Sequence, residues 1–474
     1  MAKLRVIQGG VRQGDMRALL LVRGVSDQPA VRAHQTHDGR AVPCRSTPVP
    51  AAGSAIRTAL QRRGVQAFLV ECTGLASGTA HRLMVAVGDQ GVGADFTTLP
   101  DALPAEGLTV AVASCYYDGY RRDRALQQAI MRRRDGQTPA FHIWGGDNLY
   151  LDVPADSVGH HPVDHTLDRY LRYYLESGYG LMRGTTPAFS TYDDHEFWNN
   201  YPESVPWLSR SWSQSWRSYG DATRQCLSLF QSQLNPPGPH PACFDFKIDP
   251  LSFFFLDLRT ARMRRAHGAR SMTPQAAIDH LSSWALNLRG PGVLVIGQPL
   301  WIPEGDWRDY NPPAYANQYR QIWTALRHAP YDMLVISGDV HHSRVMQISF
   351  GGTVNRHVYE FVSSPVCHIP TLAATIGLGK SQDQGSLDDV PGKVPNAGHS
   401  LSARYFFGTD AQHTFGTLHF TPLAHGQVRV GARFVNYFPK DVDARAKNIK
   451  HLPRMSGTKH EFCHNSKLFT LRMR

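Results

Sequence analysis

Acidic and histidine side chains follow several apolar, strand-like segments of this 474-residue chain. In an open α/β sheet the carboxyl ends of the parallel strands lie along one edge, where ligands bind. Carboxylates gathered at such an edge repel one another unless cations neutralise them. The pattern therefore predicts a site for more than one metal ion. Its segments are Gly-Asp147-Asn-Leu-Tyr150 after residues 140–145, Asp193-Asp194-His195-Glu196 after residues 187–192, and Gly-Asp339-Val-His341-His342 after residues 333–337.

A fourth apolar run, residues 108–113, ends in Ser114-Cys115. A thiolate beside the oxygens of Asp147 and Tyr150 would suit iron or zinc better than calcium or magnesium, which prefer oxygen ligands alone. Each residue also has a plainer interpretation. An Asp after a strand often caps a helix or turns the chain, and a buried Cys often packs as a small hydrophobe. The recurrence of the pattern after four strand-like runs favours a metal site.

These motifs, in this order, resemble those of the PhoD-like (alkaline phosphatase D) family of calcineurin-like metallophosphoesterases. The resemblance covers roughly Val110 to Val435 and includes Ser114-Cys115, Gly-Asp-x-x-Tyr, Asp-Asp-His-Glu with a following Asn199-Asn200, and Gly-Asp-Val-His. It implies an α/β fold, an αββα metallophosphoesterase sandwich. It also implies that Asp147 bridges two metal ions and that His195 is a catalytic residue facing the substrate. The implied metal ligands are Cys115, Asp147, Tyr150, Asp194, Asp339 and His341.

The resemblance further implies hydrolysis of phosphate monoesters or diesters by a metal-activated water at a polynuclear site. Two or more metal ions are expected, one Fe(3+) or Zn with Ca(2+), Mn(2+) or Mg(2+). Asn199, Asn200 and Arg259 are expected to bind substrate, although Arg259 could instead pair with Asp257 or another acid. Two other functions stay open: a nuclease or lipid-head-group phosphodiesterase, and a catalytically inactive protein of the same fold that binds a phosphate ligand.

Three positions depart from the family's pattern. Tyr192 stands where the family has a Trp, which is a mild change. His342 is an additional imidazole that could be a ligand, a proton carrier or a packed neighbour. Gln298, in Gly-Gln-Pro-Leu-Trp, ends another strand-like run, and whether it replaces an Asn ligand is open.

The chain divides into three parts by its local pattern. Residues 1–100 contain short strand-like segments between Gly, Pro and Ser turns, which predicts a small Ig/fibronectin-like β-sandwich domain. Residues 105–437 alternate apolar strands with helix-length amphipathic stretches, which predicts the PhoD-like metallophosphatase domain. The strands after His341 are expected to form a second sheet that packs on the first. The helices are expected at residues 121–133, 163–176, 209–232, 274–288 and 314–328.

Residues 438–474 form a basic C-terminal extension within a chain of net charge +11. A basic segment attracts phosphate-rich partners, so nucleic acid or phospholipid binding is one interpretation of it. A solvated extension is the other. The expected main partner is a small-molecule phosphate ester.

The seven cysteines are scattered, which argues against a disulfide framework. No segment approaches the roughly 18 consecutive apolar residues of a membrane helix. The first residues also lack the apolar core of a secretory signal. A cytoplasmic location is therefore expected, and the alternative is an exported protein whose signal is absent from this chain.

Overall fold

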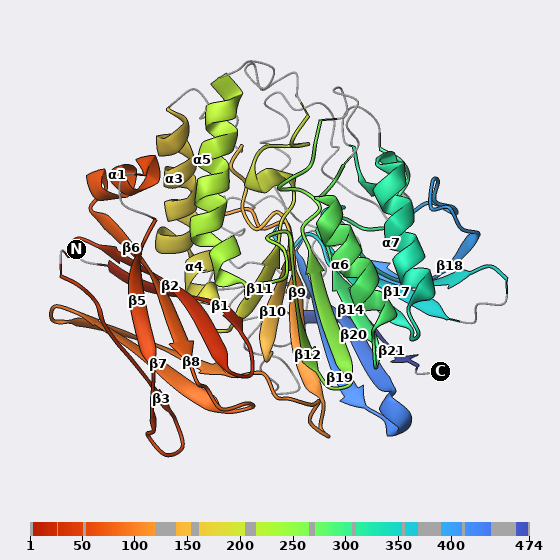
Figure 1. The fold of residues 1–474 in the computed structure, drawn as a ribbon, viewed down its shortest axis with the longest axis horizontal. Helices are drawn as coiled ribbons and strands as arrows, with labels where there is room; N and C mark the ends of the chain where they lie inside the picture. Colours follow the sequence, from red (N-terminus) through yellow and green to blue (C-terminus); the bar gives the residue numbers. More distant parts are fainter. Residues whose placement is uncertain are drawn as a thin grey trace, which may run out of the picture.

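Two β-sheets lie face to face at the centre of the computed structural model (Figure 1). The first sheet has the order β11-β10-β9-β19-β20-β21 and the second has the order β12-β13-β14-β15-β17-β16-β18. The structure describes residues 3–25, 27–50, 54–118, 139–152, 161–203, 215–264, 271–305, 310–352, 356–367, 390–409, 413–437 and 461–472.

The strands of the first sheet are β9 (Leu108–Ala113), β10 (Phe141–Gly145), β11 (Ala188–Thr191), β19 (Thr414–Pro422), β20 (Val428–Tyr437) and β21 (Glu461–Leu471). Those of the second are β12 (Cys243–Ile248), β13 (Leu251–Leu256), β14 (Gly292–Val295), β15 (Met333–Ser337), β16 (Ser343–Phe350), β17 (His357–Val362) and β18 (Leu401–Thr409). In each sheet one group of strands is parallel: β9, β10 and β11 in the first, and β13, β14, β15 and β17 in the second.

The alternation of side chains along the strands explains the layers, because successive residues of a strand point to opposite faces of its sheet. In β10, Ile143 lies in the core between the sheets, whereas Trp144 packs on the outer face against helices. In β15, Leu334 faces the core between the sheets and Val335 packs outward. Helices therefore cover both outer faces, and the αββα sandwich is confirmed.

The helices cover the sheets in two groups. The outer face of the first sheet packs against α3 (Pro162–Leu171), the π-helix η2 (Arg172–Glu176), α4 (Gly178–Arg183) and α5 (Ser215–Phe230). The outer face of the second packs against α6 (Gln275–Leu286) and α7 (Ala316–His328), which lie side by side in Figure 1. The helices expected at 163–176, 274–288 and 314–328 are confirmed, and the one at 209–232 is described from Ser215 onward. The helix expected at 121–133 lies outside the described residues.

The prediction that the late strands form a sheet of their own is wrong. β16 and β17 join β15 in the second sheet, whereas β19 and β20 extend the first sheet from β9. Each sheet thus combines a parallel group with late antiparallel strands. Both sheets bury residues in one shared apolar core. Strands of the two sheets therefore have the same apolar sequence pattern, and the sequence does not indicate which sheet a late strand joins.

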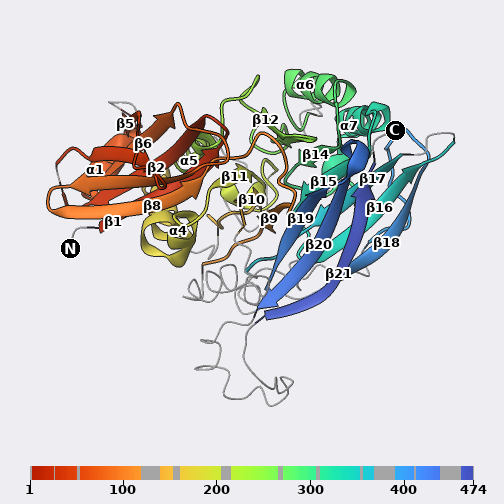
Figure 2. The same cartoon turned by 90° about the horizontal axis from the view of Figure 1, so that it is seen from below.

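The first part of the chain forms two four-stranded sheets that enclose a separate core (Figure 2). One has the order β1-β2-β6-β5 and the other β4-β3-β7-β8. Their strands are β1 (Lys3–Val11), β2 (Asp15–Arg23), β3 (Ala30–Gln35), β4 (Ala41–Val42), β5 (Cys44–Val49), β6 (Val65–Thr73), β7 (Ala80–Val87) and β8 (Gln90–Thr97), and helix α1 (Ala55–Arg62) lies between β5 and β6. The expected β-sandwich is thus present, with one helix that the turn pattern did not predict.

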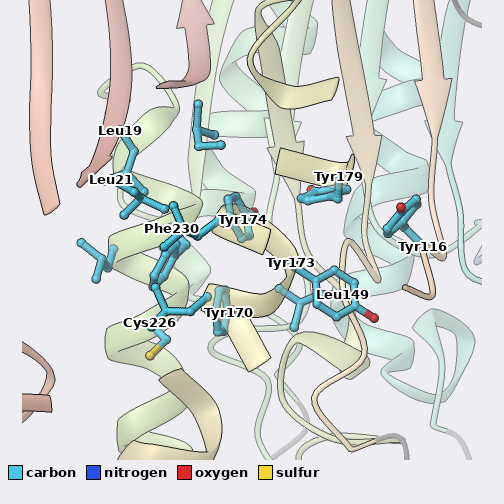
Figure 3. Packing of buried hydrophobic residues seen from close by; sticks show 14 of the residues in the cluster. Leu19, Leu21, Tyr116, Leu149, Tyr170, Tyr173, Tyr174, Tyr179, Cys226 and Phe230 are labelled. Atoms are coloured by element: carbon cyan, nitrogen blue, oxygen red, sulfur yellow. The ribbon is translucent and has the colours of Figure 1, made fainter. Parts of the chain in front are cut away.

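The sandwich is packed firmly against the central domain. Leu19 and Leu21 of β2 lie at one end of an apolar cluster that continues through Phe230 of α5 to Leu149 and Tyr116 (Figure 3). Leu149 and Tyr116 immediately adjoin two of the predicted metal ligands in the sequence. The sandwich and the metal-site loops therefore share one buried core.

Part of the C-terminal segment, whose charge suggested a solvated extension, belongs to the first sheet. Residues 438–460 lie outside the described residues, whereas Glu461–Leu471 form β21, which pairs with β20 at the edge of the first sheet. Leu471 and Phe469 are buried in the central core. Within the described residues, none of the helices is long and apolar enough to cross a membrane.

Candidate metal centre

The predicted ligands lie in loops that follow the carboxyl ends of strands in both sheets. Cys115 follows β9, Asp147 follows β10, Asp194 follows β11, and Asp339 and His341 follow β15. The motifs were expected to come from one open sheet, but β15 belongs to the second sheet. The site thus lies where the edges of two packed sheets meet.

Glycine allows these loops to approach one another closely. A Cβ atom on Gly338 would lie 2.3 Å from the Cβ of Ser114 and 2.8 Å from the carbonyl oxygen of Gly145. Each distance is too short for a real Cβ contact. The glycine that precedes Asp339 is therefore needed to bring the β15 loop against the β9 and β10 loops.

The described residues contain three groups of possible metal-donor atoms. Within each group the atoms lie no more than 4.8 Å apart, and Asp147 belongs to all three. The first adds Cys115 and His341, the second adds Asp194 and His195, and the third adds Asp193, Asp194 and Asp339. A carboxylate that belongs to two adjoining ligand sets is in the position of a bridging ligand. The structure thus brings together Cys115, Asp147, Asp194, Asp339, His341 and His195.

Tyr150 lies on the Cys115 side of the cluster. Its hydroxyl is 3.2 Å from Nε2 of His341, and its ring lies against that of His195 with centroids 4.2 Å apart. Ser364, which follows β17, donates a hydrogen bond of 3.2 Å to the Cys115 sulfur and accepts one of 3.0 Å from the His341 backbone N–H. Ser364 was not predicted, because it adjoins no acidic or histidine motif.

Burial and mutual repulsion dominate the electrostatics of this cluster. Burial, reinforced by Cys115, Asp194 and other nearby acids, raises the pKa of Asp147 well above its usual value. Burial also raises the pKa of the Cys115 thiol. Burial disfavours the charged form of Asp194 as well, but His195, Arg259 and a backbone N–H outweigh it and hold the pKa of Asp194 below its usual range. Nearby positive charge is what the cluster needs in order to ionise fully.

A second observation, an unpartnered carboxylate oxygen of Asp194, also indicates that these residues suit metal ions. Oδ1 of Asp194 is fully buried and has no hydrogen-bond partner, although Oδ2 accepts from the Asn200 backbone N–H. A buried carboxylate oxygen without a partner is costly, and a cation would satisfy it. The residues present therefore suit a metal centre at this position.

The backbone of the site is held in an unusual conformation. Positive φ angles occur at Cys115 (56°), Asp147 (50°), Asn200 (63°), Asp339 (73°) and His341 (52°). This left-handed region is disfavoured for residues with a Cβ, and such strain concentrates at ligand clamps and active sites. Five of the seven non-glycine residues of this kind in the described part of the chain lie in the loops of the candidate metal centre. This observation supports the site independently of the motifs.

His195 is oriented by a carboxylate that the sequence analysis missed. Its Nδ1 lies 2.8 Å from Oδ1 of Asp152, and both side chains are nearly buried. The other oxygen of Asp152 accepts from the Asn199 backbone N–H at 2.8 Å. A ring nitrogen of His195 lies within 4.8 Å of carboxylate oxygens of Asp147 and Asp194, and the bond to Asp152 fixes the orientation of the ring. Asp152 lies only two residues after Tyr150, but its pairing with His195 is set by the fold.

Glu196 ties the first two acidic loops together. Its carboxylate accepts backbone N–H hydrogen bonds from Asp147 (3.1 Å), Asn148 (2.6 Å) and Asp193 (2.9 Å). Burial raises the pKa of Glu196 to about 8, although these three donors act in the opposite direction. Glu196 was visible in the motif, but its role as the acceptor that joins the β10 and β11 loops required the structure.

Arg259 lies behind the cluster in a buried ion pair. Its guanidinium forms two bonds to the carboxylate of Asp193, of 2.8 and 2.9 Å, and a third, of 2.7 Å, to the Tyr201 carbonyl. The sequence left open whether Arg259 pairs with an acidic residue. The structure shows that it does, and that the partner is Asp193 rather than Asp257. Asp257 instead accepts from the backbone N–H groups of Arg259 and Thr260, at 2.8 and 2.9 Å. Asn199 and Asn200 lie beside the site, where their backbone N–H groups hold Asp152 and Asp194.

Two of the three departures from the motif pattern, Gln298 and His342, have distinct places in the structure. Gln298 is buried between Arg262, which donates to its Oε1 at 2.8 Å, and Asp339, to which its Nε2 donates at 3.1 Å. It therefore orients Asp339. Nε2 of His342 accepts a 2.6 Å bond from Arg344, and burial together with Arg344 lowers the pKa of His342 to about 3. His342 is thus a neutral packed neighbour.

Comparison with known proteins identified similar folds only among solved structures. No protein-family model and no curated protein sequence matches the chain. The structure of PhoD superposes with a TM-score of 0.61 at 16% identity, over 91% of this chain and 86% of that one. The purple acid phosphatase PPD1 from yellow lupin (Lupinus luteus) seeds superposes with a TM-score of 0.54 at 10% identity, over 91% of this chain and 71% of that one. The chain therefore has the metallophosphoesterase fold shared by PhoD and this purple acid phosphatase, as its motifs indicated.

Proposed function

We propose that this protein is a metal-dependent phosphoesterase that hydrolyses small-molecule phosphate esters. The observation that carries the proposal is the position of Asp147, whose carboxylate belongs to each of the three donor groups found among the described residues. The fold and the backbone strain around the site support it. The proposed domains are a sandwich at residues 1–100 and a PhoD-like catalytic domain at residues 105–437, to whose first sheet β21 (Glu461–Leu471) also belongs.

The proposed ligands form two sets that share Asp147. Cys115, Tyr150 and His341 offer a thiolate, a phenolate and an imidazole, a combination suited to Fe(3+) or Zn. Asp194 and Asp339 offer oxygen alone, which suits Ca(2+), Mn(2+) or Mg(2+). When bound, a metal pair of this kind supplies the Lewis acidity that activates water and neutralises phosphoryl oxygens.

The remaining residues would orient and protonate the substrate. Asp152 holds His195 in one orientation and stabilises its protonated form, so His195 can donate a proton to the leaving oxygen of the ester. Asn199 and Asn200 adjoin His195 and Asp194, so their side chains are the proposed substrate contacts. Arg259 contributes indirectly, because its pairing with Asp193 fixes the loop that carries Asp194.

The test combines metal analysis with hydrolysis of p-nitrophenyl phosphate and bis(p-nitrophenyl) phosphate. We expect the purified protein to contain about two metal ions per chain and to hydrolyse at least one of the two esters. Asp147→Asn should remove both metal and activity. Asp332→Asn is the matched control, because Asp332 is also buried but lies before β15, at the opposite end from Asp339. A protein without bound metal, or an equally active Asp147→Asn variant, would refute the proposal.

A further inference from the structure

Cys44 and Cys72 lie directly opposite each other in the N-terminal sandwich. They form one Cα pair of the antiparallel ladder between β5 and β6. The adjoining pair is Pro43 and Thr73, and the Thr73 N–H donates to the Pro43 carbonyl at 3.1 Å. Because hydrogen-bonded and non-hydrogen-bonded pairs alternate along an antiparallel ladder, Cys44 and Cys72 occupy a non-hydrogen-bonded position.

That position has the geometry of a disulfide. Residues of a non-hydrogen-bonded pair have Cα atoms about 4.5 Å apart, and disulfides span Cα distances of about 4.4–6.8 Å. Both cysteines are reduced in the structure, and they stand opposite each other in the ladder. By contrast, Cys243 on β12 lies opposite Leu256, and Cys463 on β21 lies opposite Val435.

The two thiols differ in access. Cys72 is buried in the core of the sandwich, whereas Cys44 is half-buried on β5, the edge strand of its sheet. The neighbouring Cys72 thiol lowers the pKa of Cys44, which favours the thiolate that attacks an oxidant. Cys44 is therefore the residue that would react first, and Cys72 the residue that would resolve the product.

We propose that Cys44 and Cys72 form a reversible cross-strand disulfide when the protein meets a low-molecular-weight disulfide. The Cys44 thiolate attacks one sulfur of that disulfide and releases one thiol, which leaves a mixed disulfide on Cys44. The Cys72 thiolate then attacks the Cys44 sulfur and releases the second thiol. Each cysteine loses one proton, and the oxidant is reduced to two thiols.

A disulfide between Cys44 and Cys72 would close the segment of the sandwich that contacts the central domain. Residues 44–72 include α1, which contacts α3 of the central domain. Arg63, just after α1, forms ion pairs with Asp164 and Asp168 of α3, at 2.8 and 2.5 Å. A disulfide across the base of this loop restricts the unfolded chain and ties the edge strand to β6. Oxidation should therefore stabilise the part of the sandwich that docks on the central domain.

The test is peptide mapping of the whole, metal-loaded protein after incubation with oxidised glutathione and alkylation of the remaining thiols. Trypsin separates the two cysteines, because Cys44 lies in the peptide 41–45 and Cys72 in the peptide 64–82. We expect these peptides to be linked to each other, with a mass two hydrogens below their sum, and to separate on reduction. We also expect the oxidised protein to have a higher thermal midpoint than the reduced protein.

Two variants make the result specific. Cys44→Ser should abolish the link and the oxidation-dependent rise in the thermal midpoint. Cys243→Ser should preserve both, and it is a matched control because Cys243 also lies on an edge strand. If glutathione stays attached to Cys44 without linkage to Cys72, or if both cysteines remain open to alkylation while the protein is folded, the proposal is overturned.

Discussion

Replacing the partner of His195 tests the proposed proton transfer most directly. Asp152→Asn keeps the size of the side chain and an oxygen that can accept from Nδ1, but it removes the negative charge 2.8 Å from the imidazole. A hydrogen bond to a charged group contributes about 1.5–3 kcal/mol, and a neutral one about 0.5–1.5 kcal/mol. The difference of about 1–2 kcal/mol corresponds to a loss of roughly 5- to 30-fold in rate.

His195→Ala removes the proposed acid itself and should lower kcat by about 10²–10⁴-fold. Both losses should be largest for alkyl phosphate esters, whose leaving group needs a proton, and smallest for nitrophenyl esters. The assay is therefore kcat measured over a series of leaving groups, with the metal content of each variant determined in parallel. Asp332→Asn again serves as the control.

Three results would refute this reasoning. Equal losses for good and poor leaving groups would show that His195 stabilises the phosphoryl group rather than the leaving oxygen. Loss of metal in His195→Ala would make His195 a ligand, as its place in one donor group with Asp147 and Asp194 would allow. Unchanged activity in Asp152→Asn would show that the Asp152 charge does not assist His195.

Three further predictions address the other parts of the site. Asp147→Asn should abolish hydrolysis, because a neutral amide bridges metals poorly; more than about a tenth of the activity with both metals bound would contradict the bridging role, since metal ions supply several kcal/mol at the transition state. Cys115 and Tyr150 should give an iron-loaded protein a visible charge-transfer band, which Tyr150→Phe should shift or remove; a colourless, iron-free and fully active protein would point to Zn or Mn(2+) instead. Arg259→Leu should lower the free energy of unfolding by about 3–5 kcal/mol, because it leaves its buried carboxylate partner unpaired; urea unfolding measures this, and an unchanged stability with a raised KM would assign Arg259 to the substrate instead.

The candidate ligands were predictable because local sequence determines where each strand ends. Apolar runs such as residues 108–113 and 333–337 are followed at once by polar residues, and parallel strands gather their carboxyl ends. The sheet that each strand joins was not predictable in the same way. β10 and β15 are both buried on two faces, so their apolar sequences contain no signal that separates the first sheet from the second.

Pairings between distant residues were also beyond the sequence. Arg259 and Asp193 are 66 positions apart, and their ion pair depends on β13 and β11 ending near each other. Asp152 lies in the same loop as Tyr150, but a single Asp in a loop has many ordinary roles. The edge strand β18 was not predicted for a related reason: three of its first five residues, Ser402, Arg404 and Tyr405, are exposed polar or aromatic residues, so it does not begin with an apolar run.

The strained backbone and the clustered acids at the candidate metal site both lower the stability of the fold, and both favour the binding of a cation. A left-handed conformation at a residue with a Cβ costs roughly 1–2 kcal/mol, and four of the candidate metal ligands adopt it. Burial of Asp147 beside Asp194 and Asp339 adds electrostatic repulsion. These costs are tolerable because the packed sheets and the Glu196 hydrogen bonds hold the loops in place. A cation entering the site meets ligands that are already gathered, so most of its binding energy is not spent on ordering the loops.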